Sequence, residues 1–233
     1  MAGHLTRKEL KSDQVAVTVE QTVDYVQAHQ KPIVQIVIGV VALAVIIGGI
    51  VFYRGQQQEV RDARLAEAVR VAQAPVGGAA QPDSLSFPTM EAKAAEETKV
   101  FSKLLADYPG TQQGYIAQYY LAGVDASQAR MEEARKKYDD VAKNADANTA
   151  SLAKFAMAQI LLQENKTADG QAMLKDIMDH PTEMVSKEQA IVTLATSMKA
   201  TNPAEAKKLL EPLVKEGGEI AGTAARLLNE LPK

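Results

Sequence analysis

The side chains able to do acid–base or nucleophilic chemistry are few and scattered. The three histidines, His4, His29 and His180, lie on different segments of the 233-residue chain. A general acid–base or nucleophilic site needs such groups within hydrogen-bond reach of one another. His180 precedes Pro181 at the predicted end of a helix, where an imidazole interacts favourably with the helix dipole. The histidine positions therefore predict no catalytic site.

The other reactive residue types form no recognisable motif either. The chain has no cysteine, which excludes disulfides, thiolate catalysis and cysteine-ligated metals. Gly77-Gly78 does not follow a strand, so a phosphate-binding loop is not predicted. We expect no enzyme activity, metal or cofactor. We expect the acidic pairs to lie on solvated helix faces: Glu96-Glu97, Glu132-Glu133, Asp139-Asp140, and Glu164 near Asp169. Three serines have no nearby histidine in a catalytic pattern: Ser151, Ser186 and Ser197.

Charge and composition favour a helical protein that does not bind nucleic acid. The chain has 26 Lys and Arg against 29 Asp and Glu, a net charge of -3, and these residues are well mixed. Nucleic-acid binding needs a basic stripe, which is missing. Aromatic residues make up only 5% of the chain, and alanine is abundant. Such a composition suits closely packed helices better than a β-sandwich.

A run of 21 residues without charge, at 33–53, has the sequence IVQIVIGVVALAVIIGGIVFY. As a helix rising about 1.5 Å per residue it would span roughly 31 Å, close to the roughly 30 Å hydrocarbon core of a bilayer. A removable signal peptide would lie nearer Met1 and end in a small-residue cleavage site. The run predicts a retained transmembrane helix in contact with lipid.

Residues 1–32 precede this span as an N-terminal tail. Valines recur there on one face of a predicted amphipathic helix, 13–30: Val15, Val19, Val23 and Val26. A helix that lies on a membrane surface usually has larger apolar residues and more basic charge, so docking on a partner or a loosely held helix is favoured. Four Lys and Arg residues precede the span and four follow it closely, so the positive-inside rule does not decide the orientation.

The chain after the span predicts an array of helices. Residues 54–73 are strong helix formers and predict the first helix of the array. Residues 74–88 contain two glycines and three prolines and predict a flexible loop. Residues 89–233 predict repeated helices, one of them beginning at Asn202 as N-cap and Pro203. The predicted helices are 89–108, 112–126, 128–143, 149–163, 168–179, 183–198, 203–215 and 221–231.

Every second helix repeats one pattern: a small residue, a large apolar residue four positions later, and an apolar residue four positions after that. The four copies lie 37, 36 and 36 residues apart: Glu97-Phe101-Leu105, Ala134-Tyr138-Ala142, Gly170-Leu174-Met178 and Ala206-Leu210-Val214. Glu97 is the departure from the small-residue column. One amphipathic hairpin cannot bury its own apolar face, so hairpins repeating at about this period stack on one another.

This pattern resembles the second half of a tetratricopeptide repeat. Leu121-Ala122 and Met157-Ala158 fall where that family has a Leu-Gly pair, whereas Gln118 and Lys154 stand in place of its early Trp. The resemblance implies a TPR-like α-hairpin solenoid, so the predicted fold is all-α, with a single N-terminal transmembrane helix at 33–53 followed by this solenoid.

The same resemblance implies that the first helix of each hairpin lines a concave groove. By this register Tyr119, Phe155 and Gln159 point into that groove and are the predicted protein-binding residues. Aromatic side chains in a groove are plausible anchors for a bound peptide. The alternative is that the two rings only pack between helices.

The order of tail, span, helix, Pro/Gly-rich insertion and degenerate repeats resembles a bacterial membrane-anchored tetratricopeptide family, that of the ancillary subunit of the Sec translocon. This resemblance implies a single-pass protein of the inner membrane with its domain in the periplasm. It further implies a scaffold that holds translocon subunits and periplasmic chaperones together. The alternative is a structural, self-associating adaptor of envelope or division complexes.

Overall fold

The computed structural model describes residues 30–77 and 85–232, and within the first helix it does not describe the side chains at 30–42, 50, 51, 53 and 54. In this part of the chain the fold is all-α, as predicted, with nine helices and one isolated β-bridge. The chain divides into two compact units, Met1–Glu59 and Val60–Lys233. The amphipathic helix predicted at 13–30 lies outside the described residues, apart from its last residue.

Helix α2 (Gln30–Gln73) is 44 residues long. Residues 54–73, predicted as the first helix of the array, are helical and form the end of this longer helix. Among the residues that the structure describes, no helix is both long enough and apolar enough to cross a membrane. The span predicted at 33–53 stays a prediction, because most of its side chains are not described.

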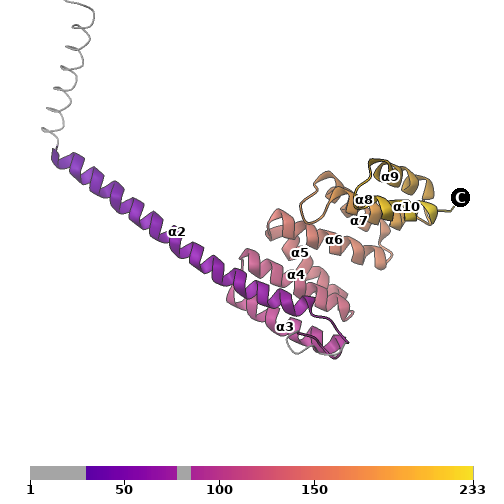
Figure 1. The fold of residues 1–233 in the computed structure, drawn as a ribbon, viewed down its shortest axis with the longest axis horizontal. Coiled ribbons are helices and arrows are strands. Elements are labelled where there is room, and N and C mark those ends of the chain that lie inside the picture. The colour runs from indigo at the N-terminus through magenta and orange to yellow at the C-terminus, as the bar shows by residue number, and fades with distance from the viewer. Residues whose placement is uncertain (1–29, 78–84, 233) are drawn as a thin grey trace, which may run out of the picture. The chain divides into compact units, whose positions relative to one another are not determined.

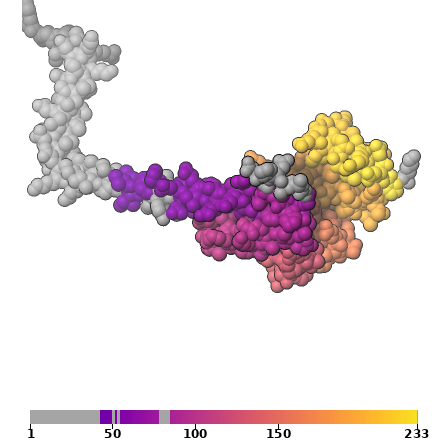
Figure 2. Space-filling view, turned by 60° about the horizontal axis from the view of Figure 1, so that its bottom comes forward, coloured from indigo at the N-terminus to yellow at the C-terminus, as the bar shows by residue number. Residues whose placement is uncertain are grey.

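The second unit comprises the end of α2, from Val60, and eight further helices. Consecutive helices pack against one another from α3 to α10, and α3 and α10 lie at opposite ends of this unit (Figure 1; Figure 2). This is the stack of hairpins that the repeat pattern predicted. The helices are α3 (Met90–Asp107), α4 (Gln112–Ser127), α5 (Met131–Asn144), α6 (Ala147–Gln163), α7 (Thr167–Asp179), α8 (Lys187–Met198), α9 (Pro203–Glu216) and α10 (Ala221–Asn229).

Side-chain caps fix where five of these helices begin. The capping residues accept hydrogen bonds from backbone N–H groups of the first turn: Thr89, Thr111, Asp146, Ser186 and Asn202. Each cap satisfies donors that the first turn of a helix leaves without a partner. The predicted start of α9 is confirmed, because Asn202 caps it and Pro203 is its first residue.

The repeat pattern marks the core accurately in its first two columns. The small residues Ala134, Gly170 and Ala206 are buried, and so are the large residues that follow them, Tyr138, Leu174 and Leu210. At Gly170 an added Cβ would lie 2.9 Å from Leu162 Cγ, so the small residue permits close packing of α7 on α6. The third column packs less well, and its last member, Val214, is 38% exposed.

The two ends of the α2–α3 connection are held together. The Gly77 N–H donates to the Phe87 carbonyl oxygen at 3.0 Å, and the Phe87 N–H donates to the Pro75 carbonyl oxygen at 3.0 Å. The ammonium group of Lys93 also donates to the Ala74 carbonyl oxygen at 2.8 Å. The predicted flexibility of 74–88 stays a prediction, because residues 78–84 lie outside the described part.

Candidate functional site

A groove of about 570 Å³ lies where α3, α4 and α5 meet, beside the end of α2. We call it the tyrosine groove and define it by Glu97, Tyr119, Tyr120, Gly123 and Tyr138, which all line it. Helix α4 packs against both α3 and α5 and provides three of these five residues. The volume lies within the range of about 300–1,000 Å³ that is typical of ligand pockets.

Four aromatic rings form a continuous row along the groove and into the core behind it. Phe101 is fully buried and stacks on Tyr120, with ring centroids 4.5 Å apart and planes 3° from parallel. Tyr120 meets Tyr119 edge to face, and Tyr119 meets Tyr138 in the same way at 5.4 Å. Such pairs stabilise one another beyond the area they bury. The row therefore fixes the tyrosine rings before any ligand arrives.

The tyrosine hydroxyl groups have no hydrogen-bond partner among the residues that the structure describes. This is most notable for Tyr138, which is only 5% exposed and lines the groove beside Gly123. Burial raises the pKa of Tyr119, Tyr120 and Tyr138, so all three hydroxyl groups stay protonated at neutral pH. An unpaired hydroxyl group in a groove can exchange hydrogen bonds with a polar group of a ligand.

Glu97 places a carboxylate in the same groove. Its side chain is 16% exposed, and the nearest cationic atom, Lys93 Nζ, lies 3.9 Å from its Oε1. Burial raises the pKa of Glu97 although the charge of Lys93 acts to lower it. The carboxylate is therefore poorly solvated and only weakly compensated by the protein.

An ion-pair network holds α4 and α5 together next to the tyrosine groove. The Asp125 side chain is 9% exposed and accepts hydrogen bonds from Arg130 and Lys137. Burial acts to raise the pKa of Asp125, but these hydrogen bonds outweigh it and hold the pKa below its usual value. Lys137 directly precedes Tyr138 in α5, so the network ties this part of α5 to α4.

The structure does not bring the three predicted binding residues together. Tyr119 lies in the tyrosine groove, whose lining includes α3 and α5, the second helices of their hairpins. Phe155 packs against the buried residues of α7 and α8, among them Leu174 and Ile177. Gln159 is exposed on α6. Protein binding by these residues stays a prediction, and Tyr120, Tyr138 and Glu97 are groove residues that the sequence did not single out for binding.

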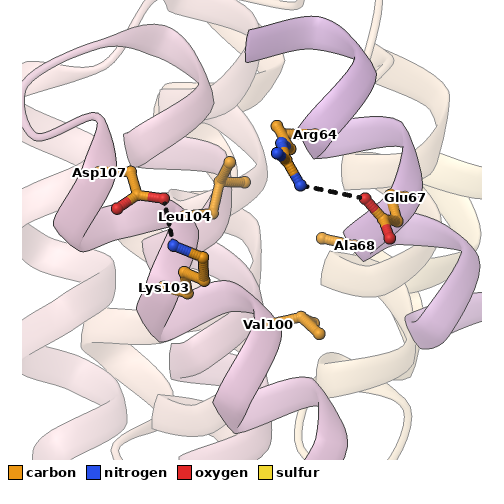
Figure 3. Close-up of a pocket in the computed structure, with 7 residues that line it drawn as sticks. All are labelled: Arg64, Glu67, Ala68, Val100, Lys103, Leu104 and Asp107. Atoms are coloured by element: carbon orange, nitrogen blue, oxygen red, sulfur yellow. Dashed lines mark hydrogen bonds and ion pairs between the residues drawn. The ribbon is translucent and has the colours of Figure 1, made fainter. Parts of the chain in front are cut away.

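A smaller hollow of about 130 Å³ lies between α2 and α3 (Figure 3). Its apolar lining consists of Ala68, Val100 and Leu104. The four charged groups around it form two ion pairs, which Figure 3 shows with dashed lines: Arg64 with Glu67 at 3.8 Å, and Lys103 with Asp107 at 2.8 Å. Since each charge has a partner of the opposite sign, this hollow is a weaker candidate than the tyrosine groove.

A third hollow, of about 160 Å³, brings a serine and a histidine near each other, which the sequence did not suggest. The Ser151 hydroxyl is hydrogen-bonded to Thr182 Oγ1 at 2.7 Å and to the Asn148 carbonyl oxygen. The imidazole of His180 lies against Asp176 at the end of α7, where His180 is the C-cap residue. No hydrogen bond joins Ser151 to His180 within the described part, and the Ser151 hydroxyl instead links α6 to Thr182.

No cluster of three or more metal-ligating side chains occurs among the described residues.

A search against protein-family models matches residues 30–190 to the tetratricopeptide repeat-like domain. The chain belongs to that family. Curated proteins and solved structures provide no match to this chain. Membership of the tetratricopeptide repeat-like family indicates a protein-binding scaffold, a fold class that is typically not catalytic.

Proposed function

We propose that this chain is a single-pass membrane protein whose TPR-like domain binds other proteins in the periplasm. In this proposal it is an ancillary subunit of the Sec translocon that assists contacts with periplasmic chaperones. The observation that carries the binding function is the tyrosine groove, which combines packed aromatic rings and unpaired hydroxyl groups with a carboxylate, that of Glu97, whose only ion-pair partner in the described part of the chain is Lys93 at 3.9 Å. The translocon assignment is supported by the resemblance of the domain order.

Exposed apolar side chains on α2 support a membrane anchor. Leu43, Val45, Ile46 and Ile47 are exposed by 53 to 69%, and Phe52 by 74%. Residues of a helix are separated by about 100° around its axis, so these four residues spread over more than one face of the helix. A protein partner covers one face of a helix, whereas lipid chains surround it. Contact with lipid therefore accounts for these exposed apolar side chains better than contact with a protein partner.

The translocon assignment is tested by chemical crosslinking followed by purification of the full chain from detergent-solubilised membranes. Mass spectrometry should identify Sec translocon subunits and a periplasmic chaperone. Recovery of only the chain itself, or of cell-wall and division proteins, would support the self-associating adaptor in its place. A chain that stays in the soluble fraction after lysis without detergent would refute the anchor.

The orientation has its own test. In spheroplasts, an added protease should digest the domain that follows 33–53 and leave cytoplasmic control proteins intact. Protection of the domain would place it in the cytoplasm and would end the proposal of a periplasmic scaffold.

The predicted concave surface is tested separately through Gln159, whose exposure makes it tolerant of substitution. Gln159→Arg should reduce recovery of the crosslinked partners if that surface binds them. Ala172→Arg, at an exposed position of α7, is the matched control and should have no effect. Equal recovery with both variants would remove Gln159 from the binding surface.

A further inference from the structure

The tyrosine groove has a charge that selects among possible ligands. Two carboxylates line it, Glu91 and Glu97, and one ammonium group, that of Lys93. Lys93 already donates to the Ala74 carbonyl oxygen at 2.8 Å, and its 3.9 Å distance from Glu97 is too long for a hydrogen bond. In the described part of the chain, no group donates a hydrogen bond to the Glu97 carboxylate. The groove is therefore complementary to a cation.

Glu97 is also out of place in the packing scheme of the repeats. It stands in the column that holds Ala134, Gly170 and Ala206 in the other three repeats, all of them buried. A small residue there is sufficient for the hairpin to pack, as those three repeats show. A carboxylate in this partly buried position costs stability, so packing does not account for Glu97.

Among cationic side chains, arginine fits the groove best. Its planar guanidinium group has five N–H donors, which can pair with the Glu97 carboxylate and with the hydroxyl oxygens of Tyr119, Tyr120 and Tyr138. It is more weakly hydrated than the ammonium group of lysine and interacts well with aromatic rings. A volume of about 570 Å³ also leaves room for the neighbouring residues of an extended segment.

We propose that the tyrosine groove binds an arginine side chain from an extended segment of a partner protein, with Glu97 pairing with the guanidinium group. This inference rests on the proposed function as a protein-binding scaffold and names the chemistry of the partner. It places the contact on α3, α4 and α5, and of the three residues predicted for the concave groove it uses only Tyr119.

The test uses the full chain in lipid nanodiscs and seven-residue peptides labelled with a fluorophore. The peptides share leucine and alanine flanks and differ at the central residue, which is arginine, lysine, citrulline or glutamate. Citrulline keeps the shape of arginine and removes its charge. Fluorescence polarisation should give an affinity for the arginine peptide at least about tenfold above that for the citrulline peptide, as expected for a charge-assisted pair. The glutamate peptide should bind most weakly.

The same measurement on Glu97→Gln separates the carboxylate from the rest of the groove. This variant should lose most of the preference for arginine over citrulline, while its melting temperature is equal to or above that of the wild type. Glu133→Gln, at an exposed position of α5, is the matched control and should keep the preference. A second variant, Tyr120→Phe, removes one hydroxyl group and should weaken the arginine peptide more than the citrulline peptide.

Three results would overturn the inference. They are an arginine peptide that fails to bind at about 1 mM, an unchanged preference in Glu97→Gln, and equal binding of the arginine and glutamate peptides. If the chain nevertheless recovers translocon subunits from membranes, the scaffold function stands and only the arginine contact is wrong. Failure of that recovery counts against the scaffold function itself.

Discussion

Gly114 lies where the connection from α3 turns into α4, and we predict that Gly114→Ala destabilises the domain. A Cβ atom added to Gly114 would lie 2.2 Å from the Tyr108 carbonyl oxygen, far inside van der Waals contact. That carbonyl oxygen accepts a hydrogen bond from Thr111 Oγ1 at 2.8 Å, and Thr111 Oγ1 accepts one from the Gly114 N–H at 3.2 Å. The clash therefore falls on backbone atoms and on the cap of α4.

The size of the effect follows from three contributions. Overpacking of a buried position costs about 1–3 kcal/mol, because the backbone of Tyr108 has to move. A weakened Thr111 cap costs about 1 kcal/mol more. The higher helix propensity of alanine offsets about 1 kcal/mol of this. The free energy of unfolding should thus fall by about 1–3 kcal/mol, which lowers the melting temperature of a domain of this size by about 2–12 °C.

The assay is thermal unfolding of the full chain in detergent, followed by circular dichroism. Gly123→Ala is a matched control in the same helix, because its Cβ would lie at an ordinary 3.5 Å from the Tyr138 hydroxyl oxygen. This control should gain about 0.5–1 kcal/mol from its helix propensity. A Gly114→Ala variant as stable as Gly123→Ala would refute the close approach of α4 to Tyr108.

Three more predictions concern the α4–α5 hairpin. Asp125→Ala should lower the free energy of unfolding by about 1–3 kcal/mol, because it leaves Arg130 and Lys137 without their shared partner while both stay partly solvated. Denaturant unfolding measures this loss, and a loss within about 0.3 kcal/mol of zero would contradict the network. The lowered pKa of Asp125 means that its stabilisation is complete above its unfolded pKa of about 3.9 and is lost as the pH falls through the lower folded pKa. The melting temperatures of wild type and Asp125→Ala should therefore converge only below about pH 4, and convergence near neutral pH would show that another group is responsible. Ala129→Gly should raise the free energy of unfolding by about 0.5–1 kcal/mol, since Ala129 has a φ of 60° that glycine adopts without strain. The control Ala172→Gly, within α7, should lower the free energy of unfolding by about 1 kcal/mol. An equal loss in both variants would refute the strain at Ala129.

The sequence predicted the helices best where a capping residue marks the boundary. Asn202 and Pro203 gave the start of α9 correctly. The predicted start of α5 at Gln128 was three residues early, because Ala129 adopts a left-handed conformation that alanine does not signal. The predicted start of α8 at Glu183 was four residues early. Val185 is buried in the loop before that helix, and Ser186 is the residue that caps it.

The candidate site was only partly visible in the sequence. Glu97 was apparent as the one charged residue in a column of small residues, but its meaning depends on Tyr120 and Tyr138 lying beside it. Those three residues come from three helices, and a periodic pattern does not determine which side chains meet between them. The register placed Tyr119 in the predicted concave groove with Phe155 and Gln159, whereas its contact with Tyr138 became evident only from the packing of α4 on α5.

The claim that this chain works by holding other proteins in the tyrosine groove is tested most directly by photo-crosslinking in living cells. Ser127, an exposed residue that lines the groove, is replaced by the photoreactive residue p-benzoylphenylalanine, and Ala172 is replaced in the same way as the control. We expect the Ser127 position alone to give adducts, and we expect these to contain translocon subunits or a periplasmic chaperone. The same adducts from both positions, or none from Ser127 in a folded chain, would contradict this account.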